Sequence, residues 1–363
     1  MPYATSYEQK VDIKSLLQTT VNQNASDLHL VVGSPPIIRV DGVLGPIPDV
    51  LPLTTEMVEN LLWQIMTSEQ KELLLTNKEV DFSFAFGNIA RFRVNAYFQK
   101  GYVSASLRFV PMRIKTIEEL NLPKICYEFT KLVQGFILVT GPTGHGKSTT
   151  LASMLNEINQ NRPVHILTIE DPIEYVYPQG KSIVSQRELH LDTHSYALAL
   201  RSAMREDPDV VLIGEMRDYE TIASSLTIAE TGHLVFATLH TNDAAQTIDR
   251  IVDVFPENQQ AQVKMQLSGT LEAVVSQRLI PAIEGGRVPA CEILLATPAV
   301  KTVIREGKTH QIRNIIQTSG DLGMRTLETS LAEWVKKGKI SLETALTFAL
   351  HPGEVERMVR GTK

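Results

Sequence analysis

One glycine-rich stretch of the sequence decides the fold: Gly141-Pro142-Thr143-Gly144-His145-Gly146-Lys147-Ser148. The apolar run 136–139 precedes it, and a pattern typical of a helix begins at Thr149 and extends to residue 158. A glycine-rich loop between a buried strand and a helix turns successive backbone N–H groups toward a polyphosphate. Lys147 would reach the terminal phosphates as a point charge, and Ser148 would offer its hydroxyl to Mg²⁺. We therefore expect a nucleotide-binding domain in preference to a purely structural glycine turn.

Length and composition indicate an ordinary globular protein. The chain has 363 residues, 43% of them hydrophobic, and a net charge of −6, so two or three domains with substantial cores are expected. A dense basic stripe, the mark of nucleic-acid binding, is missing from the sequence, and no nucleic-acid partner is expected. The apolar runs fall short of the roughly 18 residues that span a bilayer. Cys126 and Cys291 lack zinc-binding spacing, which favours buried apolar thiols in a cytoplasmic protein.

The pattern of apolar residues divides the chain at a polar connector that begins at Pro111. Residues 1–112 are expected to form an N-terminal α+β domain, and residues 113–126 a linker that can act as a hinge. The expected elements of the first domain are helices at 11–20 and 54–75 and antiparallel strands at 28–32, 37–40, 80–86, 91–98 and 103–110. Asp41-Gly42 and Gly87-Asn88 are typical of the hairpin turns between such strands.

Residues 127–363 alternate short apolar strands with helical segments. Strands are expected at 136–139, 165–169, 210–213 and 234–239. Such alternation predicts a parallel sheet with helices on both faces and a ligand at the carboxyl ends of its strands. From about residue 298 onward the chain is expected to be helical. The predicted fold class is α/β for this domain, with the smaller α+β domain before it.

Two of the expected strands end in acidic residues. The first is followed by Glu170-Asp171-Pro172-Ile173-Glu174, and the second by Gly214-Glu215-Met216-Arg217-Asp218. Cleavage of a phosphoanhydride needs one carboxylate to orient and deprotonate water and others to hold Mg²⁺ with its waters. The alternatives are an acidic surface turn for the first group and a simple ion pair between Arg217 and Asp218 for the second.

His233 and His240 flank the expected strand 234–239. An extended strand would separate them by about 23 Å at about 3.3 Å per residue, so they cannot share one metal ion. His240, at the carboxyl end of the strand, is expected to sense the terminal phosphate. His233 is expected to serve elsewhere, for example at an interdomain contact, or to be a satisfied structural histidine.

Arg91, Arg93 and Arg108 lie on expected strands of the first domain. Arg91 and Arg93 share a face, because side chains two residues apart on a strand point to the same side. Ordinary exposed strand charges are one interpretation. The other is functional, because phosphate transfer commonly uses an arginine delivered from another domain or subunit, and a hinge at the connector would allow it.

Together these motifs resemble the secretion ATPase superfamily, and in particular the PilT-like type IV pilus retraction ATPases, over nearly the whole chain. Further stretches that carry the resemblance are Ala25-Ser26-Asp27-Leu28-His29-Leu30, Arg91-Phe92-Arg93-Val94-Asn95, Asp207-Pro208-Asp209-Val210, Thr231-Gly232-His233, His240-Thr241-Asn242 and Gly323-Met324-Arg325-Thr326-Leu327-Glu328. The retraction signature Ala-Ile-Arg-Asn-Leu-Ile-Arg-Glu is matched at half of its residues by Ala299-Val300-Lys301-Thr302-Val303-Ile304-Arg305-Glu306.

The resemblance implies a homohexameric ATPase that drives type IV pilus retraction and twitching motility. Each subunit would have a PAS-like N-terminal domain and a RecA-like ATPase domain, with ATP and Mg²⁺ as ligands. The implied roles are phosphate and Mg²⁺ binding by Lys147 and Ser148, catalysis by Glu174, support of Mg²⁺ and water by Glu215, γ-phosphate sensing by His240, and phosphate contacts by Arg93, Arg108 and Arg91. The implied partners are an inner-membrane pilus platform protein and, as a further candidate, a second retraction ATPase. The location would be peripheral, at the inner face of the cytoplasmic membrane.

Other functions remain open at this point. Motors for pilus assembly or type II secretion usually carry an additional N-terminal domain and a tetracysteine zinc motif, and two cysteines argue against both. An accessory retraction ATPase would share the chemistry of the main one. The presence of Lys147, Glu174 and Glu215 counts against a non-hydrolysing regulator. A nucleic-acid translocase is disfavoured by the acidic balance and by the lack of basic residues interleaved with aromatic ones.

Overall fold

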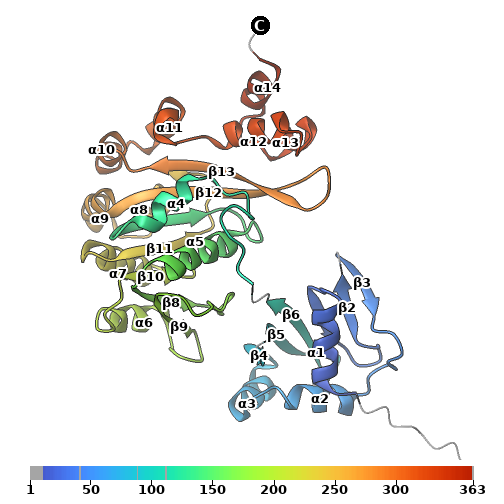
Figure 1. Ribbon diagram of the computed structural model, residues 1–363. Helices are drawn as coiled ribbons and strands as arrows, with labels where there is room; N and C mark the ends of the chain where they lie inside the picture. Colours follow the sequence, from blue (N-terminus) through green and yellow to red (C-terminus); the bar gives the residue numbers. More distant parts are fainter. Residues whose placement is uncertain (1–10, 41, 88, 111–112, 362–363) are drawn as a thin grey trace, which may run out of the picture. The chain divides into compact units, whose positions relative to one another are not determined.

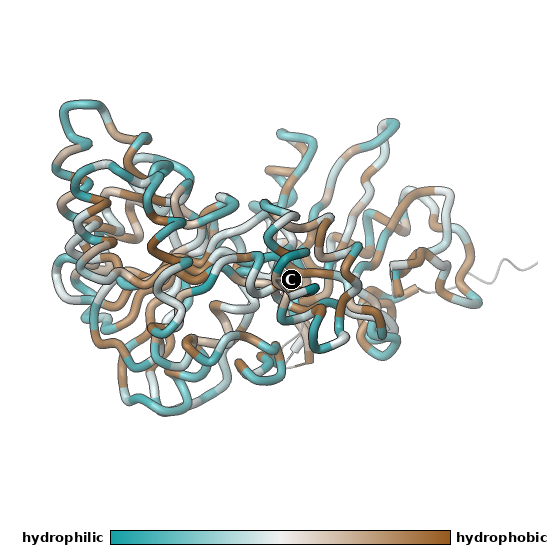
Figure 2. Tube along the Cα trace, turned by 90° about the horizontal axis from the view of Figure 1, so that it is seen from above, coloured by the Kyte–Doolittle hydropathy of each residue, from teal (hydrophilic) through white to brown (hydrophobic). Residues whose placement is uncertain are grey.

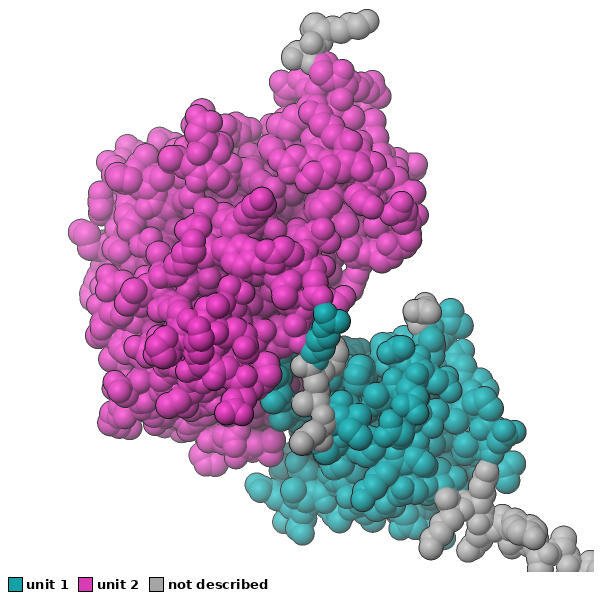
Figure 3. Space-filling view, viewed as in Figure 1, with its two compact units in different colours: residues 1–113, 174–176 teal, residues 114–173, 177–363 magenta. Residues whose placement is uncertain are grey.

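The computed structural model describes residues 11–361 except 41, 88, 111 and 112 (Figure 1). It divides into an N-terminal unit, residues 1–113 with 174–176, and a C-terminal unit, residues 114–173 with 177–363 (Figure 3). The expected domain boundary at residue 112 and the start of the connector at Pro111 lie outside the described residues. Asp41 and Asn88 of the two hairpin signals do so as well.

The N-terminal unit is built on a six-stranded antiparallel sheet with the strand order β3-β2-β1-β6-β5-β4. The strands are β1 (Asp27–Leu30), β2 (Ile37–Val40), β3 (Val43–Pro46), β4 (Glu79–Phe86), β5 (Ala90–Gln99) and β6 (Tyr102–Val110). Along β5, Phe92 and Val94 are fully buried while Arg91 and Arg93 are half-buried. One face of the sheet therefore carries the core and the other carries the arginines.

Three helices complete the N-terminal unit: α1 (Ile13–Asn22), α2 (Thr55–Trp63) and α3 (Ser68–Asn77). The expectation of one continuous helix at 54–75 is wrong, because that segment holds two helices. Thr54 caps α2, because its hydroxyl accepts from the backbone N–H of Met57. Thr67 then begins α3 with a capping box, in which its hydroxyl accepts from the N–H of Gln70 and the Gln70 side chain accepts from the N–H of Thr67.

The C-terminal unit contains a seven-stranded sheet with the order β13-β12-β7-β11-β10-β8-β9, parallel except for β13. Its strands are β7 (Gly135–Thr140), β8 (His165–Glu170), β9 (Ile183–Glu188), β10 (Val210–Ile213), β11 (Leu234–Leu239), β12 (Leu271–Pro281) and β13 (Arg287–Leu295). The four expected strands are β7, β8, β10 and β11. Strands β9, β12 and β13 were not predicted from the sequence.

Helices cover both faces of this sheet. They are α4 (Ile125–Lys131), α5 (Lys147–Asn161), α6 (Tyr196–Ala203), α7 (Tyr219–Glu230), α8 (Ala244–Asp253) and α9 (Glu257–Thr270). Ile137 of β7 belongs to the apolar cluster that includes Leu155 of α5, while the next residue, Leu138, belongs to the cluster that includes Leu226 of α7. Successive side chains of one buried strand thus fill two cores. Figure 2 shows hydrophilic residues mainly on the outer loops and apolar residues mainly in the interior of the trace.

The described part of the chain after residue 297 is helical, as the sequence indicates. It comprises α10 (Pro298–Glu306), α11 (Ile312–Thr318), α12 (Leu327–Lys336), α13 (Leu342–Phe348) and α14 (Pro352–Arg360), with short 3₁₀ turns at Thr309–Gln311 and Gly320–Leu322. Leu331 of α12 and Val355 of α14 share an apolar cluster with Ile280 of β12. Within the described residues, no helix combines the length and the apolar character that crossing a membrane requires.

Candidate nucleotide-binding site

The phosphate loop joins β7 to α5 with a backbone geometry that glycine permits. It begins at Gly141, after the end of β7, and α5 begins at Lys147. Gly144 and Gly146 have φ angles of +78° and +79°, in the left-handed region that favours glycine. A Cβ atom at Gly141 would lie 2.2 Å from the carbonyl oxygen of Gln277 in β12. Glycine therefore allows the loop to lie against that strand.

A side chain of β12 that the sequence analysis missed supports the loop. Gln277 Nε2 donates to the carbonyl oxygen of His145 (2.7 Å), and Gln277 Oε1 accepts from Thr150 Oγ1 in α5 (2.7 Å). The backbone N–H of Leu279 donates to His145 Nδ1 (3.0 Å). Burial, followed by the charges of nearby basic side chains, lowers the pKa of His145. The neutral ring keeps Nδ1 available as an acceptor.

Lys147 is 7% exposed, and its ammonium group is held within the loop. Nζ donates to the carbonyl oxygens of Gly141 (2.8 Å) and Pro142 (3.1 Å) and lies 3.3 Å from His240 Nδ1. A phosphate oxygen would compete for this donor, because a charged acceptor forms the stronger hydrogen bond. The other loop residues predicted to bind nucleotide lie in the loop or in the first turn of α5: Thr143, Gly144, His145, Gly146, Ser148 and Thr149.

Glu215, which follows β10, is held by two side chains. Arg217 contacts both of its carboxylate oxygens, each at 2.8 Å, and His240 Nε2 lies 3.0 Å from Oε1. Burial raises the pKa of Glu215, but the hydrogen bond and positive charge of Arg217, together with the contact from His240, outweigh it and hold that pKa below its usual range. The suggested ion pair between Arg217 and Asp218 is wrong. Asp218 instead caps α7 by accepting from the N–H of Thr221.

His240 lies between the phosphate loop and the acid. Its Nδ1 is 3.2 Å from Thr143 Oγ1 and 3.3 Å from Lys147 Nζ, while its Nε2 faces Glu215. Because Lys147 can only donate, Nδ1 is the acceptor in its contact with Lys147, and Nε2 is the ring nitrogen that faces Glu215. The structure therefore brings together Lys147, His240, Glu215 and Arg217, four residues that the sequence singled out.

The acidic segment after β8 separates into buried and exposed members. Glu170 is 7% exposed, and its Oε1 accepts from Thr168 Oγ1 (2.7 Å) and Gln186 Nε2 (3.4 Å). Asp171 and Glu174 are exposed, and residues 174–176 group with the N-terminal unit. Glu170 thus has a structural place at the end of β8. The catalytic role of Glu174 stays a prediction.

Tyr196, at the start of α6, is a second residue that the sequence analysis missed. Burial, followed by the charges of Asp171, Glu170 and Glu215, raises the pKa of its phenol, which therefore stays protonated. A Cβ atom at Gly214 would lie 3.1 Å from Tyr196 Oη and 3.2 Å from Glu170 Cα. A glycine before Glu215 thus allows β10 to end close to β8 and Tyr196. No local motif in the sequence signals this contact.

His233 has local contacts at the end of α7. Its Nδ1 lies 3.0 Å from the carbonyl oxygen of Ile228 and 3.1 Å from Thr231 Oγ1. The strand between it and His240 is extended, which keeps the two rings from a common metal ion. These contacts fit the interpretation of a structural histidine, and a role at an interdomain contact stays a prediction.

The arginines of the N-terminal unit occupy neighbouring positions on its sheet. Arg93 and Arg108 lie directly opposite each other on β5 and β6, and Arg91 is two residues along from Arg93. Arg108 Nε lies 3.0 Å from Asp27 Oδ1, and Asp27 also contacts Arg39 at 3.7 Å. The side chain of Arg108 is nonetheless 70% exposed. Asp27 therefore pairs with Arg108 and Arg39, while Arg93 and Arg91 lie beside Arg108 on the same face of the sheet.

The residues around the loop fit a magnesium ion that accompanies a nucleotide. Among the described residues, no group of three or more acidic, histidine or cysteine side chains is placed to hold a metal by itself. Mg²⁺ typically takes one or two protein oxygens and completes its shell with phosphate oxygens and water. Ser148, second in α5, and the ionised Glu215 supply that kind of ligand.

The sequence matches the family described as "Type II/IV secretion system protein" over residues 7–347. The chain belongs to this family. It is 51% identical to the type IV pilus retraction ATPase PilT of Pseudomonas aeruginosa, in an alignment that covers 94% of this chain and 99% of that protein. It is 38% identical to the type IV pilus ATPase PilU of the same organism, over 96% of this chain and 92% of that protein.

A solved structure gives the same result for the fold. The pilus retraction motor PilT with bound ADP superposes with a TM-score of 0.90 at 46% identity, over 96% of this chain and 100% of that one. The predictions of the secretion ATPase family, of its PilT-like retraction ATPases and of the two-domain α/β fold are confirmed.

Proposed function

We propose that this chain is an ATP-hydrolysing motor subunit for type IV pilus retraction. The observation that carries the proposal is the set of contacts of His240, which lies within hydrogen-bond distance of both the phosphate-loop Lys147 and the acid Glu215. The high identity to pilus retraction ATPases over nearly the whole chain supports retraction as the process that this motor drives.

ATP would bind with its phosphates in the loop 141–148. The backbone N–H groups and the start of α5 favour negative charge there. Lys147 would exchange its carbonyl acceptors for phosphate oxygens. Ser148 and, through water, Glu215 would hold Mg²⁺, whose charge offsets that of the β- and γ-phosphates.

His240 would report the presence of the γ-phosphate. In the structure its Nδ1 faces Lys147 and Thr143, and its Nε2 faces Glu215. A γ-phosphate that engages Lys147 removes one of these contacts and leaves the other side of the ring bonded to the acid. The position of Glu215 then depends on the nucleotide, which is the property that a motor needs at its catalytic centre.

Hydrolysis would use Glu174 as the general base. A water molecule attacks the γ-phosphorus, its proton passes to the Glu174 carboxylate, and the bond to the β-phosphate oxygen of ADP breaks to give ADP and inorganic phosphate. Arg93 and Arg108, with Arg91, would neutralise the charge that develops on the transferred phosphoryl group. Their positions on adjacent strands of one sheet support a joint action.

The assembly would be a homohexamer at the cytoplasmic face of the inner membrane. Its partner would be the pilus platform protein, and a second retraction ATPase is a further candidate partner. Closure and opening of subunit interfaces with each ATP cycle would move the platform protein, so that pilin subunits leave the base of the filament.

Deletion of the gene, followed by counting of surface filaments, tests the direction of the motor. We expect the deletion strain to carry excess filaments and to lose surface motility. The wild-type gene should return both to normal, and a gene carrying Lys147→Ala should not. Cells without filaments would identify an assembly motor instead. Filaments that still retract would indicate an accessory ATPase.

A further inference from the structure

A buried carboxylate of β13 holds the start of α8. Glu292 is 4% exposed, and its Oε1 accepts from the backbone N–H of Ala244, the first residue of α8, at 2.9 Å. The first N–H groups of a helix have no partner within the helix. Asp243 caps α8 by accepting from Gln246 N. Glu292 is therefore a second acceptor for the same helix end, and it comes from the sheet.

The start of α8 is tied to the nucleotide site by a short connection. Residues 241–243 separate His240 from Ala244. A residue spans at most about 3.6 Å, so a shift of Ala244 changes the positions that His240 can reach. The connection is also bonded to the helix, because Thr241 Oγ1 lies 2.7 Å from Thr247 Oγ1.

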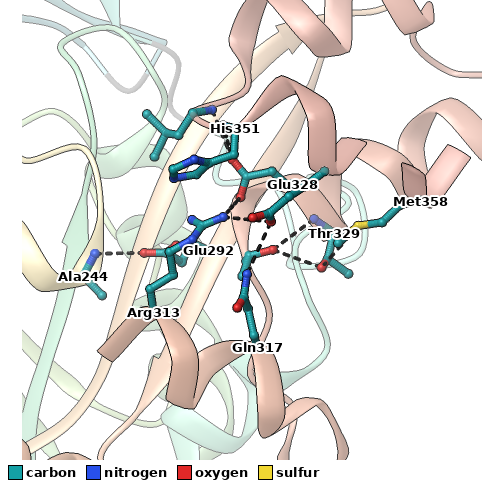
Figure 4. Close-up of polar contacts among 11 residues, drawn as sticks. Ala244, Glu292, Arg313, Gln317, Glu328, Thr329, His351 and Met358 are labelled. Atoms are coloured by element: carbon teal, nitrogen blue, oxygen red, sulfur yellow. Dashed lines mark hydrogen bonds and ion pairs between the residues drawn. The ribbon is translucent and has the colours of Figure 1, made fainter. Parts of the chain in front are cut away.

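On its other side, Glu292 faces charged residues of the C-terminal helices. Arg313 of α11 lies between Glu292 and Glu328 (Figure 4), and its Nη2 contacts Glu328 Oε2 at 3.3 Å and Glu354 Oε2 at 2.8 Å. Glu328 of α12 is fully buried and accepts from the backbone N–H groups of residues 350 and 351. The Arg313–Glu328 pair thus connects α11, α12 and the start of α14.

A cavity next to these charges leaves room for movement. Its volume is about 130 Å³, and its lining includes Glu292, Arg313, Asp243 and His351. An interior of normal density would fix every side chain, whereas space beside charged groups allows them to change partners. Glu292 is thus bonded to α8 on one side and lines this cavity on the other.

We propose that Glu292 is a positioning residue for His240, and that it transmits the position of the helices α11–α14 to the γ-phosphate site. The inference rests on the function proposed above. Glu292 does not touch the nucleotide; it acts through Ala244 and residues 241–243. Movement of the C-terminal helices would shift Glu292, then the start of α8, and so the contacts of His240 with Lys147 and Glu215.

Two variants break the bond from opposite ends. Glu292→Met removes the acceptor at similar length, and Ala244→Pro removes the donor. Proline is favoured at the first position of a helix, and the extended backbone of Asp243 (ψ 172°) suits the residue before a proline. We expect each to lower kcat about tenfold and to reduce, by a similar factor, the preference for a non-hydrolysable ATP analogue over ADP.

The affinity for ADP itself should change less than about twofold, because the phosphate loop is untouched. Glu292→Gln keeps an acceptor and should restore both kcat and the nucleotide preference. The matched control is Ser330→Ala, which removes the bond from the N–H of Cys291 (3.1 Å), the neighbour of Glu292 on β13. It should lower stability and leave the nucleotide preference intact.

Unchanged nucleotide preference and kcat in a folded Ala244→Pro or Glu292→Met protein would overturn the inference. The same would follow if Ser330→Ala caused an equal loss. If Glu292→Met does not fold, Ala244→Pro decides. Lack of phosphate release by the wild-type chain would contradict the proposed function, and the nucleotide preference of the variants would still test the role of Glu292.

Discussion

At the scale of single residues, the surroundings of Glu215 and Glu174 bear on the role proposed for each acid in the nucleotide site. Glu215 is held by Arg217 and His240, so its carboxylate is already engaged before any nucleotide binds. Glu174 lies in an exposed loop. These contacts suit Glu215 to orient ligands, whereas Glu174 is the proposed general base.

Glu174→Gln should retain ATP binding and lower kcat by about 10²–10⁴-fold, because the amide cannot accept the proton. Nucleotide affinity and single-turnover phosphate release measure the two effects separately. Glu215→Gln is the matched comparison and should cause a smaller loss. If Glu215→Gln alone abolishes hydrolysis, the roles of the two acids are the reverse of those proposed.

Glu292 makes stability depend on pH. The pKa of Glu292 is raised from its ordinary 4.5 to about 7, mainly by burial. The hydrogen bond from Ala244 and the charge of Arg313 lower this pKa, whereas the negative charges of Asp243 and Glu328 raise it further. The folded protein then keeps a proton that the unfolded chain releases. The contribution of Glu292 to the free energy of unfolding should therefore fall as pH rises from 4.5 to about 7, by about 3 kcal/mol.

Urea unfolding of the wild type and of Glu292→Gln between pH 4.5 and 8 measures this contribution as a difference. The charged and titratable groups that face the site, and that both proteins share, are Asp243, Arg313, Glu328, His351 and Glu354. We expect a smaller fall in stability with pH for Glu292→Gln. Parallel curves would refute the assigned titration.

The sequence predicted the residues of the site that belong to local motifs. Lys147, Glu215 and His240 each follow a buried strand, and parallel strands bring their carboxyl ends to one edge. Gln277 and Glu292 could not be found in this way, because their partners lie more than 45 residues away in the sequence. Burial, not a motif, gives them their importance.

At the scale of elements, β12 links the phosphate loop to the rest of the sheet. It pairs with β7 through parallel contacts, and Gln277 bonds both the loop and α5. This strand is not evident in the sequence, because α9 ends at Thr270 and β12 begins at Leu271, with no loop between them. The strands that were predicted are short apolar runs bounded by polar or glycine residues.

Gln277→Ala should loosen the phosphate loop. It removes two hydrogen bonds of buried groups, so we expect a loss of about 1–3 kcal/mol in the free energy of unfolding. The affinity for ADP should fall about tenfold, because the loop is no longer held in its binding geometry. Gln266→Ala is the control, since it removes an exposed side-chain bond to Glu230. Equal effects of the two variants would exclude a specific role for Gln277.

At the scale of the whole molecule, activity is expected to need both units. The N-terminal unit carries Arg93 and Arg108 on one face of its sheet, and the C-terminal unit carries the phosphate loop. The sequence predicted both the arginines and the phosphate loop, because strand periodicity and a loop motif are local signals. It contains no local signal for how the units meet.

The double variant Arg93→Gln with Arg108→Gln should lower kcat by about 10³-fold or more, with a smaller change in nucleotide affinity. Arg39→Gln is the matched control, because Arg39 contacts the same Asp27 and has no proposed role. Steady-state ATP hydrolysis and ADP titration measure the two quantities. Equal activity of the double variant and the control would remove these arginines from the mechanism.

The central claim is that the loop 141–148 is a site of ATP hydrolysis. Steady-state phosphate release by the purified full chain with ATP and Mg²⁺ tests it most directly. We predict release by the wild type and by Lys131→Ala, which alters an exposed lysine paired with Glu128. For folded Lys147→Ala we predict a loss of at least about 100-fold. Phosphate release by Lys147→Ala at the wild-type rate would contradict the account.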